Sequence, residues 1–153
     1  MASTVAAAAL TVTITEQITL NGTTYDQNVV KSISGIGNYT KSIHTVTGSG
    51  VAHNLAEFVP VASGSKYAVE DLRYVRVTNL DDTNALELAV VGAATLYQVE
   101  LAAGESHILG NPDAVMLAEA DTSPSFGTMA DIASLQVNPA GNAIDVEVFI
   151  ALV

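Results

Sequence analysis

The chain has no cysteine and no tryptophan, and only five of its 153 residues are lysine or arginine. Without cysteine it has neither disulfides nor thiolate metal ligands, and the sequence carries no mark of a redox compartment. Aromatic residues make up 5% of the chain. Carbohydrate-binding modules usually depend on exposed aromatic platforms, so this scarcity counts against that class.

Positive charge is absent from the second half of the chain. Residues 1–76 hold all five basic residues and five acidic ones, whereas residues 77–153 hold eleven acidic residues and no basic one. The net charge is −11. A field of one sign repels nucleic acid, so we expect no DNA or RNA partner and interpret the acidic half as a solvated surface.

Long apolar runs are also missing. No stretch reaches the roughly 18–20 apolar residues that span a bilayer, so no membrane partner is expected. The N-terminal sequence MASTVAAAAL has no positive residue before its short apolar run. It therefore lacks the pattern of a signal peptide.

The nucleotide-binding and hydrolase motifs are absent as well. There is no phosphate-binding Gly-x4-Gly-Lys sequence, and Gly35-Ile36-Gly37 lacks the third glycine of a dinucleotide fingerprint. No Gly-x-Ser-x-Gly elbow is present. His44, His53 and His107 lie far apart in the sequence, without the close spacing of paired metal ligands. We predict that the protein is not an enzyme and needs no cofactor or metal.

Three groups of acidic residues need a separate interpretation. The sequence Asp81-Asp82-Thr83-Asn84 offers oxygen ligands but lacks the spacing and glycine of an EF-hand loop, so a turn is favoured over a calcium site. The acidic pairs Glu70-Asp71 and Asp145/Glu147 resemble a catalytic carboxylate pair. On strands, such residues more often face solvent.

Alternation with a period of two is the main signal that is present. Between Asp71 and Leu109, three runs place apolar residues on one parity: 72–79, 85–91 and 95–101. Turn-forming residues separate these runs. The pattern predicts an antiparallel meander at the centre of the chain.

The two ends of the chain alternate too. Leu10–Leu20 is a predicted strand, Asn21-Gly22 predicts a type I′ turn, and Thr23–Ile33 is the return strand. In the last run, Val146, Val148 and Ile150 are predicted to be buried, with Asp145 and Glu147 facing outward. Further strands are expected at 39–46, 55–62, 106–109 and 115–118, a strand or short helical turn at 131–137, and loops at 34–38 and 121–128.

These patterns predict an all-β fold, an antiparallel β-sandwich or jelly-roll-like single domain over residues 10–153. A barrel is the other all-β possibility. Residues 1–9 are small and alanine-rich, and are expected to form an N-terminal arm, either extended or a short helical start.

Three stretches taken together resemble small virion structural proteins of tailed bacteriophages, particularly of marine and freshwater phages. They are Thr13–Glu16 with Thr19–Gly22 (TITE, TLNG), Tyr74–Asn84 (YVRVTNLDDTN) and Ala102–Leu109 (AAGESHIL). The resemblance implies a capsid decoration (cement) protein that binds and stabilises the major capsid protein lattice. It also implies synthesis in the bacterial host cytoplasm and a final location on the capsid surface of the virion. The resemblance transfers no functional residue.

Two alternatives remain beside the decoration protein. One is a tail or neck component of the same virion. The other, from a different class, is a carbohydrate-binding β-sandwich module.

The sequence also suggests how the protein assembles. Phe149 and Val153 fall on the parity opposite the predicted core, so an apolar patch would be exposed unless a neighbour covers it. We therefore predict a homo-oligomer, with a trimer implied by the resemblance, that docks on the lattice through its neutral N-terminal part. The predicted interface residues are Val5, Leu10, Val12, Phe149 and Val153. A monomer with residues 1–9 as a disordered tail is the competing prediction.

Overall fold

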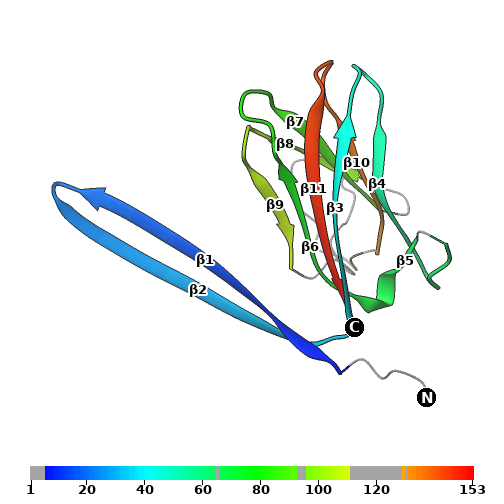
Figure 1. Cartoon of the computed structure of the whole chain (residues 1–153), viewed down its shortest axis with the longest axis horizontal. Helices are drawn as coiled ribbons and strands as arrows, with labels where there is room; N and C mark the ends of the chain where they lie inside the picture. The colour runs from blue at the N-terminus through cyan, green and yellow to red at the C-terminus, as the bar shows by residue number, and fades with distance from the viewer. Residues whose placement is uncertain (1–5, 65, 93–95, 111–128, 130) are drawn as a thin grey trace.

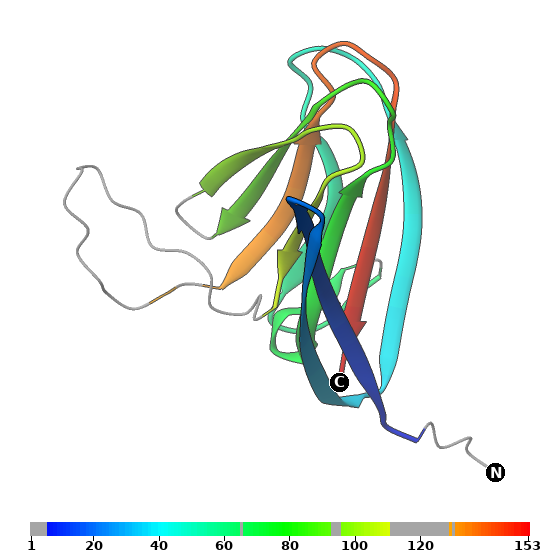
Figure 2. The same cartoon turned by 90° about the vertical axis from the view of Figure 1, so that its left-hand side faces the viewer.

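The structure, a computed structural model, describes residues 6–64, 66–92, 96–110, 129 and 131–153. Two β-sheets pack face to face, and a long two-stranded hairpin projects away from them (Figure 1). Seen from the side, the hairpin leaves the sandwich close to the C-terminus (Figure 2). The predicted all-β class is confirmed, since the described residues contain strands and one short 3-10 turn, η1 (Val69–Asp71).

Each sheet of the sandwich combines strands from distant parts of the chain. The five-stranded sheet has the order β5 (Tyr67–Ala68), β4 (His53–Val59), β10 (Ile132–Asn138), β7 (Leu86–Gly92), β8 (Leu96–Leu101). The four-stranded sheet has the order β3 (Asn38–Val46), β11 (Ile144–Leu152), β6 (Leu72–Asn79), β9 (Ser106–Leu109). Neighbouring strands are antiparallel except β4 and β5, which are parallel.

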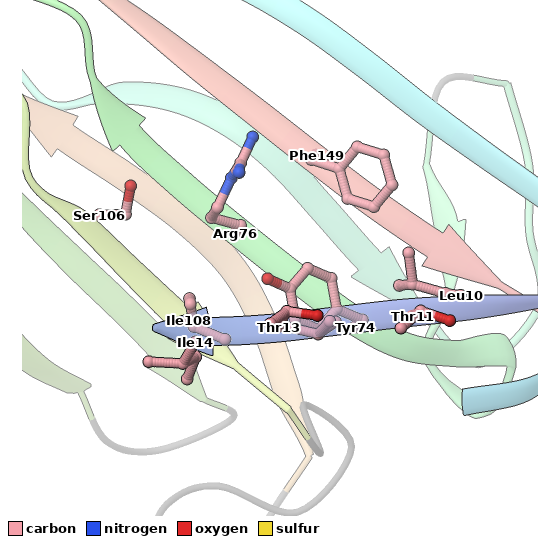
Figure 3. Close-up of a pocket in the computed structure, with 10 residues that line it drawn as sticks. Leu10, Thr11, Thr13, Ile14, Tyr74, Arg76, Ser106, Ile108 and Phe149 are labelled. Atoms are coloured by element: carbon pink, nitrogen blue, oxygen red, sulfur yellow. The ribbon is translucent and has the colours of Figure 1, made fainter. Parts of the chain in front are cut away.

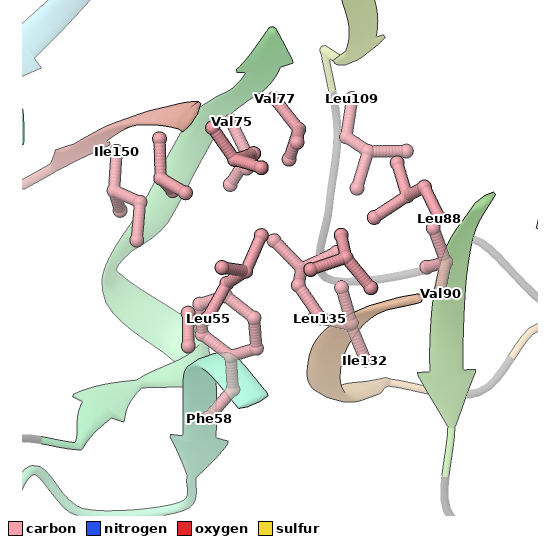
Figure 4. Close-up of a cluster of buried hydrophobic side chains, with 14 of the residues drawn as sticks. Leu55, Phe58, Val75, Val77, Leu88, Val90, Leu109, Ile132, Leu135 and Ile150 are labelled. Atoms are coloured by element: carbon pink, nitrogen blue, oxygen red, sulfur yellow. The ribbon is translucent and has the colours of Figure 1, made fainter. Parts of the chain in front are cut away.

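The core lies between the two sheets and consists of aliphatic side chains from both, together with Phe58 (Figure 4). The predicted core residues Val146, Val148 and Ile150 are buried. Leu88 and Val90 face them from the opposite sheet and are completely buried. The prediction that Asp145 and Glu147 face outward holds for direction, but Glu147 is only 8% exposed.

The predicted meander is wrong. Strand β6 belongs to the four-stranded sheet, whereas β7 and β8 pair with each other in the five-stranded sheet. The chain crosses between the sheets after Asn79, whose side chain is fully buried. Its Nδ2 donates to the carbonyl oxygens of Asn84, Leu101 and Ala102. These bonds tie the loop that follows Asn79 to the end of β8, at the point where the chain crosses between the sheets.

The N-terminal boundary also differs from the prediction, which placed residues 10–36 in the sandwich. Among the described residues, strands β1 (Ala8–Leu20) and β2 (Thr23–Ile36) pair only with each other and form a separate two-stranded sheet, here called the arm. The predicted turn is confirmed: Asn21 and Gly22 have φ of 51° and 80°, as a type I′ turn requires.

The structure confirms some of the remaining predictions for strands and loops and differs from others. Residues 131–137, left open between strand and helical turn, form β10 at the centre of the five-stranded sheet. The loop expected at 34–38 reduces to Gly37, because β2 continues to Ile36 and β3 begins at Asn38. A Cβ on Gly37 would lie 3.3 Å from the backbone of Val153, so this join is tightly packed. The predictions for 115–118 and 121–128 lie outside the described residues.

Candidate functional site: the hairpin arm

The register of the arm separates its side chains into two chemically different faces. Leu20 pairs with Thr23 and Ile14 with Val29, so even positions of β1 share a face with odd positions of β2. We call this the apolar face; it consists of Leu10, Val12, Ile14, Glu16, Ile18, Leu20, Thr23, Tyr25, Gln27, Val29, Lys31 and Ile33. The opposite face is polar and threonine-rich, with Val30 as its large apolar side chain.

The base of the apolar face packs on the sandwich. Leu10, Val12 and Ile33 contact a small cluster around Tyr74 and Ala151 on the outside of the four-stranded sheet. Phe149 belongs to the same cluster and contacts two aromatic rings. Its ring lies 6.0 Å from that of Tyr74 in an edge-on arrangement and 6.0 Å from that of Tyr39 in a stacked one. This second core, separate from the main one, fixes the arm to the sandwich.

Among the described residues, no side chain of the distal half of the apolar face, from Ile14 and Val29 to Leu20 and Thr23, belongs to this cluster. Ile18 and Tyr25 are each 60% exposed, and Ile14, Leu20 and Val29 are exposed as well. The tip of the arm lies well clear of both sheets (Figure 1). Monomeric soluble proteins rarely expose contiguous apolar patches of this kind, so the distal half is the candidate contact surface.

A cleft of about 360 Å³ opens where the arm crosses the sheet (Figure 3). Residues 10–14 of β1 form one wall. Tyr74, Arg76, Ser106, Ile108 and Phe149 form the other. The lining combines apolar and hydroxyl groups with one guanidinium and contains no carboxylate or histidine. It is suited to binding rather than to proton transfer.

An ion cluster lies on the outside of the four-stranded sheet. Glu147 of β11 accepts from Lys41 of β3 at 2.7 Å and from Arg76 of β6 at 2.5 Å. The hydrogen bond from Lys41, together with that from Arg76, holds the pKa of the Glu147 carboxyl below its usual range, against the opposing effect of burial. Two cations therefore share one carboxylate, and this part of the sheet carries a local positive charge.

The Asp81–Asn84 stretch forms a turn that uses its own oxygen atoms. Oδ1 of Asp81 accepts from the backbone N–H groups of Thr83 and Asn84 at 2.8 and 2.7 Å. The hydrogen bonds from Asn84 and Thr83 lower the pKa of Asp81. Within the described residues, no group of three histidine, aspartate or glutamate side chains is placed to hold a metal ion.

The three histidines occupy separate local hydrogen bonds. His44 bonds with Ser42 at 2.8 Å, and His53 bonds with the carbonyl of Thr47 at 2.7 Å. His107 bonds with the hydroxyl of Tyr97 at 2.9 Å, and burial lowers the pKa of this histidine. The Ser42–His44 pair shows no bond to a carboxylate among the described residues, so it lacks the orienting third member of a hydrolytic triad.

The predicted interface residues are brought together in part. Leu10, Val12 and Phe149 meet at the base of the arm, where they are partly buried within one chain. Phe149 lies opposite the main core as predicted, but the arm of the same molecule covers it, so no neighbour is needed for its burial. Val153 is 43% exposed at the C-terminus, and Val5 lies outside the described residues.

Comparison with known proteins found no match to the chain among family models, curated proteins or solved structures. In the part of the chain that the structure describes, no helix has the length and apolar character needed to cross a membrane.

The sequence left open whether Leu10–Leu20 forms two shorter strands or one long strand that passes out of the core, and the structure shows one long strand in an arm separate from the sandwich. The alternation of Leu10–Leu20 is the same whether its apolar face covers a core or a partner. Glu16, which interrupts that face, is the one signal that the strand does not run through a core. The Lys41–Glu147–Arg76 cluster was also missed, because it joins three strands whose order the sequence does not show.

Proposed function

We propose that this chain is a virion structural protein of a tailed bacteriophage, a capsid decoration protein that binds and stabilises the major capsid protein lattice as a homo-oligomer. The sequence resemblance supports a role as a structural component of the virion. The amphipathic arm supports a role in protein–protein contact, because an exposed apolar surface of this kind usually marks an interaction site. The trimer and the location on the capsid surface belong to the same proposal.

The arm is the observation that carries the contact role. Along β1 its polar and apolar faces are separated except at Glu16, and its base is anchored by Phe149 and Tyr74. Three of the five basic residues, Lys31, Lys41 and Arg76, lie on the arm or on the sheet beneath its base. This side of the molecule therefore carries most of the basic residues of the chain, which suits contact with a partner that offers carboxylates.

Quantitative mass spectrometry of purified virions tests the proposal. A decoration protein is expected in a copy number that is a fixed, large fraction of that of the major capsid protein. A few copies per virion would contradict decoration and indicate the tail or neck instead. Absence from the particles would contradict any virion role.

A carbohydrate-binding module is a second candidate, favoured by one observation. Tyr39 is 66% exposed and stacks on Phe149 with an angle of 24° between the rings, which forms a small aromatic platform on the sheet. Sugar rings bind to such platforms through their apolar faces. A glycan array probed with the wild type and with Tyr39→Ala separates the two candidates: sugar binding lost in the variant would favour this module.

A further inference from the structure

The chain carries two incompletely covered surfaces that match each other. One is the distal half of the arm's apolar face. The other is the outer sheet face, the outward side of the four-stranded sheet, which consists of Tyr39, Lys41, Ile43, Thr45, Tyr74, Arg76, Thr78, Ser106, Ile108, Asp145, Glu147, Phe149 and Ala151. We propose that the distal half of one copy's arm binds the outer sheet face of a second copy. This deepens the proposed function, on whose homo-oligomer it rests, by naming the surfaces that join the copies.

The contact extends one that already exists within the chain. The base of the apolar face packs on Tyr74, Phe149 and Ala151, at one end of the outer sheet face. The arm then runs past the sheet, and its tip lies clear of it (Figures 1 and 2). Ile43, 60% exposed, is thus left without cover by its own arm. A second arm on the same face would continue the packing of the first.

The charges of the two surfaces are complementary. Glu16 is the one charged side chain on the distal half of the apolar face, and its cross-strand partner is the neutral Gln27. On the outer sheet face, Lys41 and Arg76 share the single carboxylate of Glu147. The Lys41 side chain is 54% exposed and is therefore accessible to a further carboxylate. Asp145 precedes Glu147 near the start of β11 and accepts a hydrogen bond from the hydroxyl of Thr45 at 2.6 Å.

The arm itself requires such a partner. A single two-stranded hairpin is marginally stable in water, because each strand has one pairing edge and no layer covers the apolar face. In the part of the chain that the structure describes, such a layer covers the base of the arm and not Ile18, Leu20 or Tyr25. A second copy supplies it for Ile18, Leu20 and Tyr25.

The proposed contact joins two different patches, so every copy both gives and receives an arm. Such heterologous contacts close into a ring, or into a reciprocal pair, when the geometry returns to its start. Closure leaves neither of these two patches without a partner. It also leaves the threonine-rich face of each arm directed away from the contact.

Sedimentation velocity of the purified full chain tests the proposal. The wild type is expected to sediment above the monomer mass. Ile18→Asp is expected to raise the dissociation constant on the order of 100-fold, because it places a charge in the apolar contact. Thr15→Asp, on the polar face of the same strand, is the matched control and is expected to leave association unchanged. A monomeric wild type, or equal losses in both variants, would overturn the proposal.

A charge exchange keeps the test independent of how Ile18→Asp folds. Glu16→Lys and Lys41→Glu are each expected to weaken association about tenfold. An equimolar mixture of the two variants is expected to associate more tightly than either variant alone, because two of the three contacts of a mixed trimer, and both contacts of a mixed reciprocal pair, then join an arm and a sheet of opposite charge. A mixture no tighter than either variant alone would overturn the proposed pairing. Wild type that binds virions as a monomer would overturn this inference and the homo-oligomer while supporting the virion role, whereas an oligomer that binds no virion would support this inference and contradict the virion role.

Discussion

Phe149→Ala is expected to release the arm while leaving the sandwich folded. The Phe149 ring lies on the outside of the four-stranded sheet, where it contacts Tyr39 and Tyr74 and packs against the base of the arm. Removing a fully buried phenylalanine costs about 3–5 kcal/mol. Because this ring is partly exposed, we expect about 2 kcal/mol, and the loss falls on docking of the arm rather than on the main core.

Trypsin provides a clean assay, because the chain has only five lysine and arginine residues. Lys31 lies on β2, near the docked base, so its cleavage reports on release of the arm. A loss of about 2 kcal/mol corresponds to cleavage up to about 30-fold faster. The melting temperature of the sandwich is expected to change little in the same variant, since Phe149 is not part of the main core.

Phe149→Leu is the control, because it keeps an apolar side chain at the base and should accelerate cleavage only slightly. If Phe149→Ala left cleavage at Lys31 unchanged, the ring would not anchor the arm. If it lowered the melting temperature as strongly as a change in the main core, the separation of the two cores would be wrong.

Three further predictions concern the core, the turn and the ion cluster. Val148→Asp should destabilise the protein by several kcal/mol, because it buries an unpaired charge; a variant that melts like the wild type would contradict the assigned core. Asn21 and Gly22 both have positive φ, so replacing them with alanine should cost about 1–2 kcal/mol at each position. Amide hydrogen exchange should then rise in the arm alone, and exchange equal to that of the wild type would contradict this. The folded protein holds the pKa of Glu147 below its value in the unfolded chain, which is about 4.3. The ionised carboxylate therefore stabilises the fold fully above that pH, and this stabilisation is lost as the pH falls through the pKa of the folded state. Thermal melts should therefore show a gap between wild type and Glu147→Gln at pH 7 that narrows below about pH 4, and a gap independent of pH would refute this account.

Local patterns in the sequence predicted the buried faces well. Val146, Val148 and Ile150 alternate with polar or bulky residues, and a strand with one buried face must show this period whatever its neighbours are. The Asn21-Gly22 turn was predictable for a similar reason, because its positive φ values depend on two adjacent residues.

Pairing between distant strands was not predictable in the same way. The runs 72–79 and 85–91 both face the core, but they do so from opposite sheets, and alternation alone does not distinguish the two arrangements. The buried Asn79 makes the crossing possible, through bonds to carbonyl groups that only the fold brings near. Glu147 was expected to face solvent, and its burial depends on Lys41 and Arg76 from two other strands.

The residues of the candidate site were predicted in part. The sequence identified Leu10, Val12 and Phe149 as apolar residues outside the core, and the structure brings them together within one molecule. It did not show that the contact surface continues to Ile18, Leu20 and Tyr25, because a strand pattern contains no information about how far a hairpin extends from the fold.

The central claim is that another copy of the chain covers the distal half of the arm. Hydrogen exchange of the wild type, measured by mass spectrometry across a range of protein concentrations, tests it most directly. We expect peptides covering residues 14–20 and 23–29 to exchange more slowly as the concentration rises, while peptides from β7 and β10 stay constant. Fast exchange in the arm at every concentration would contradict the claim.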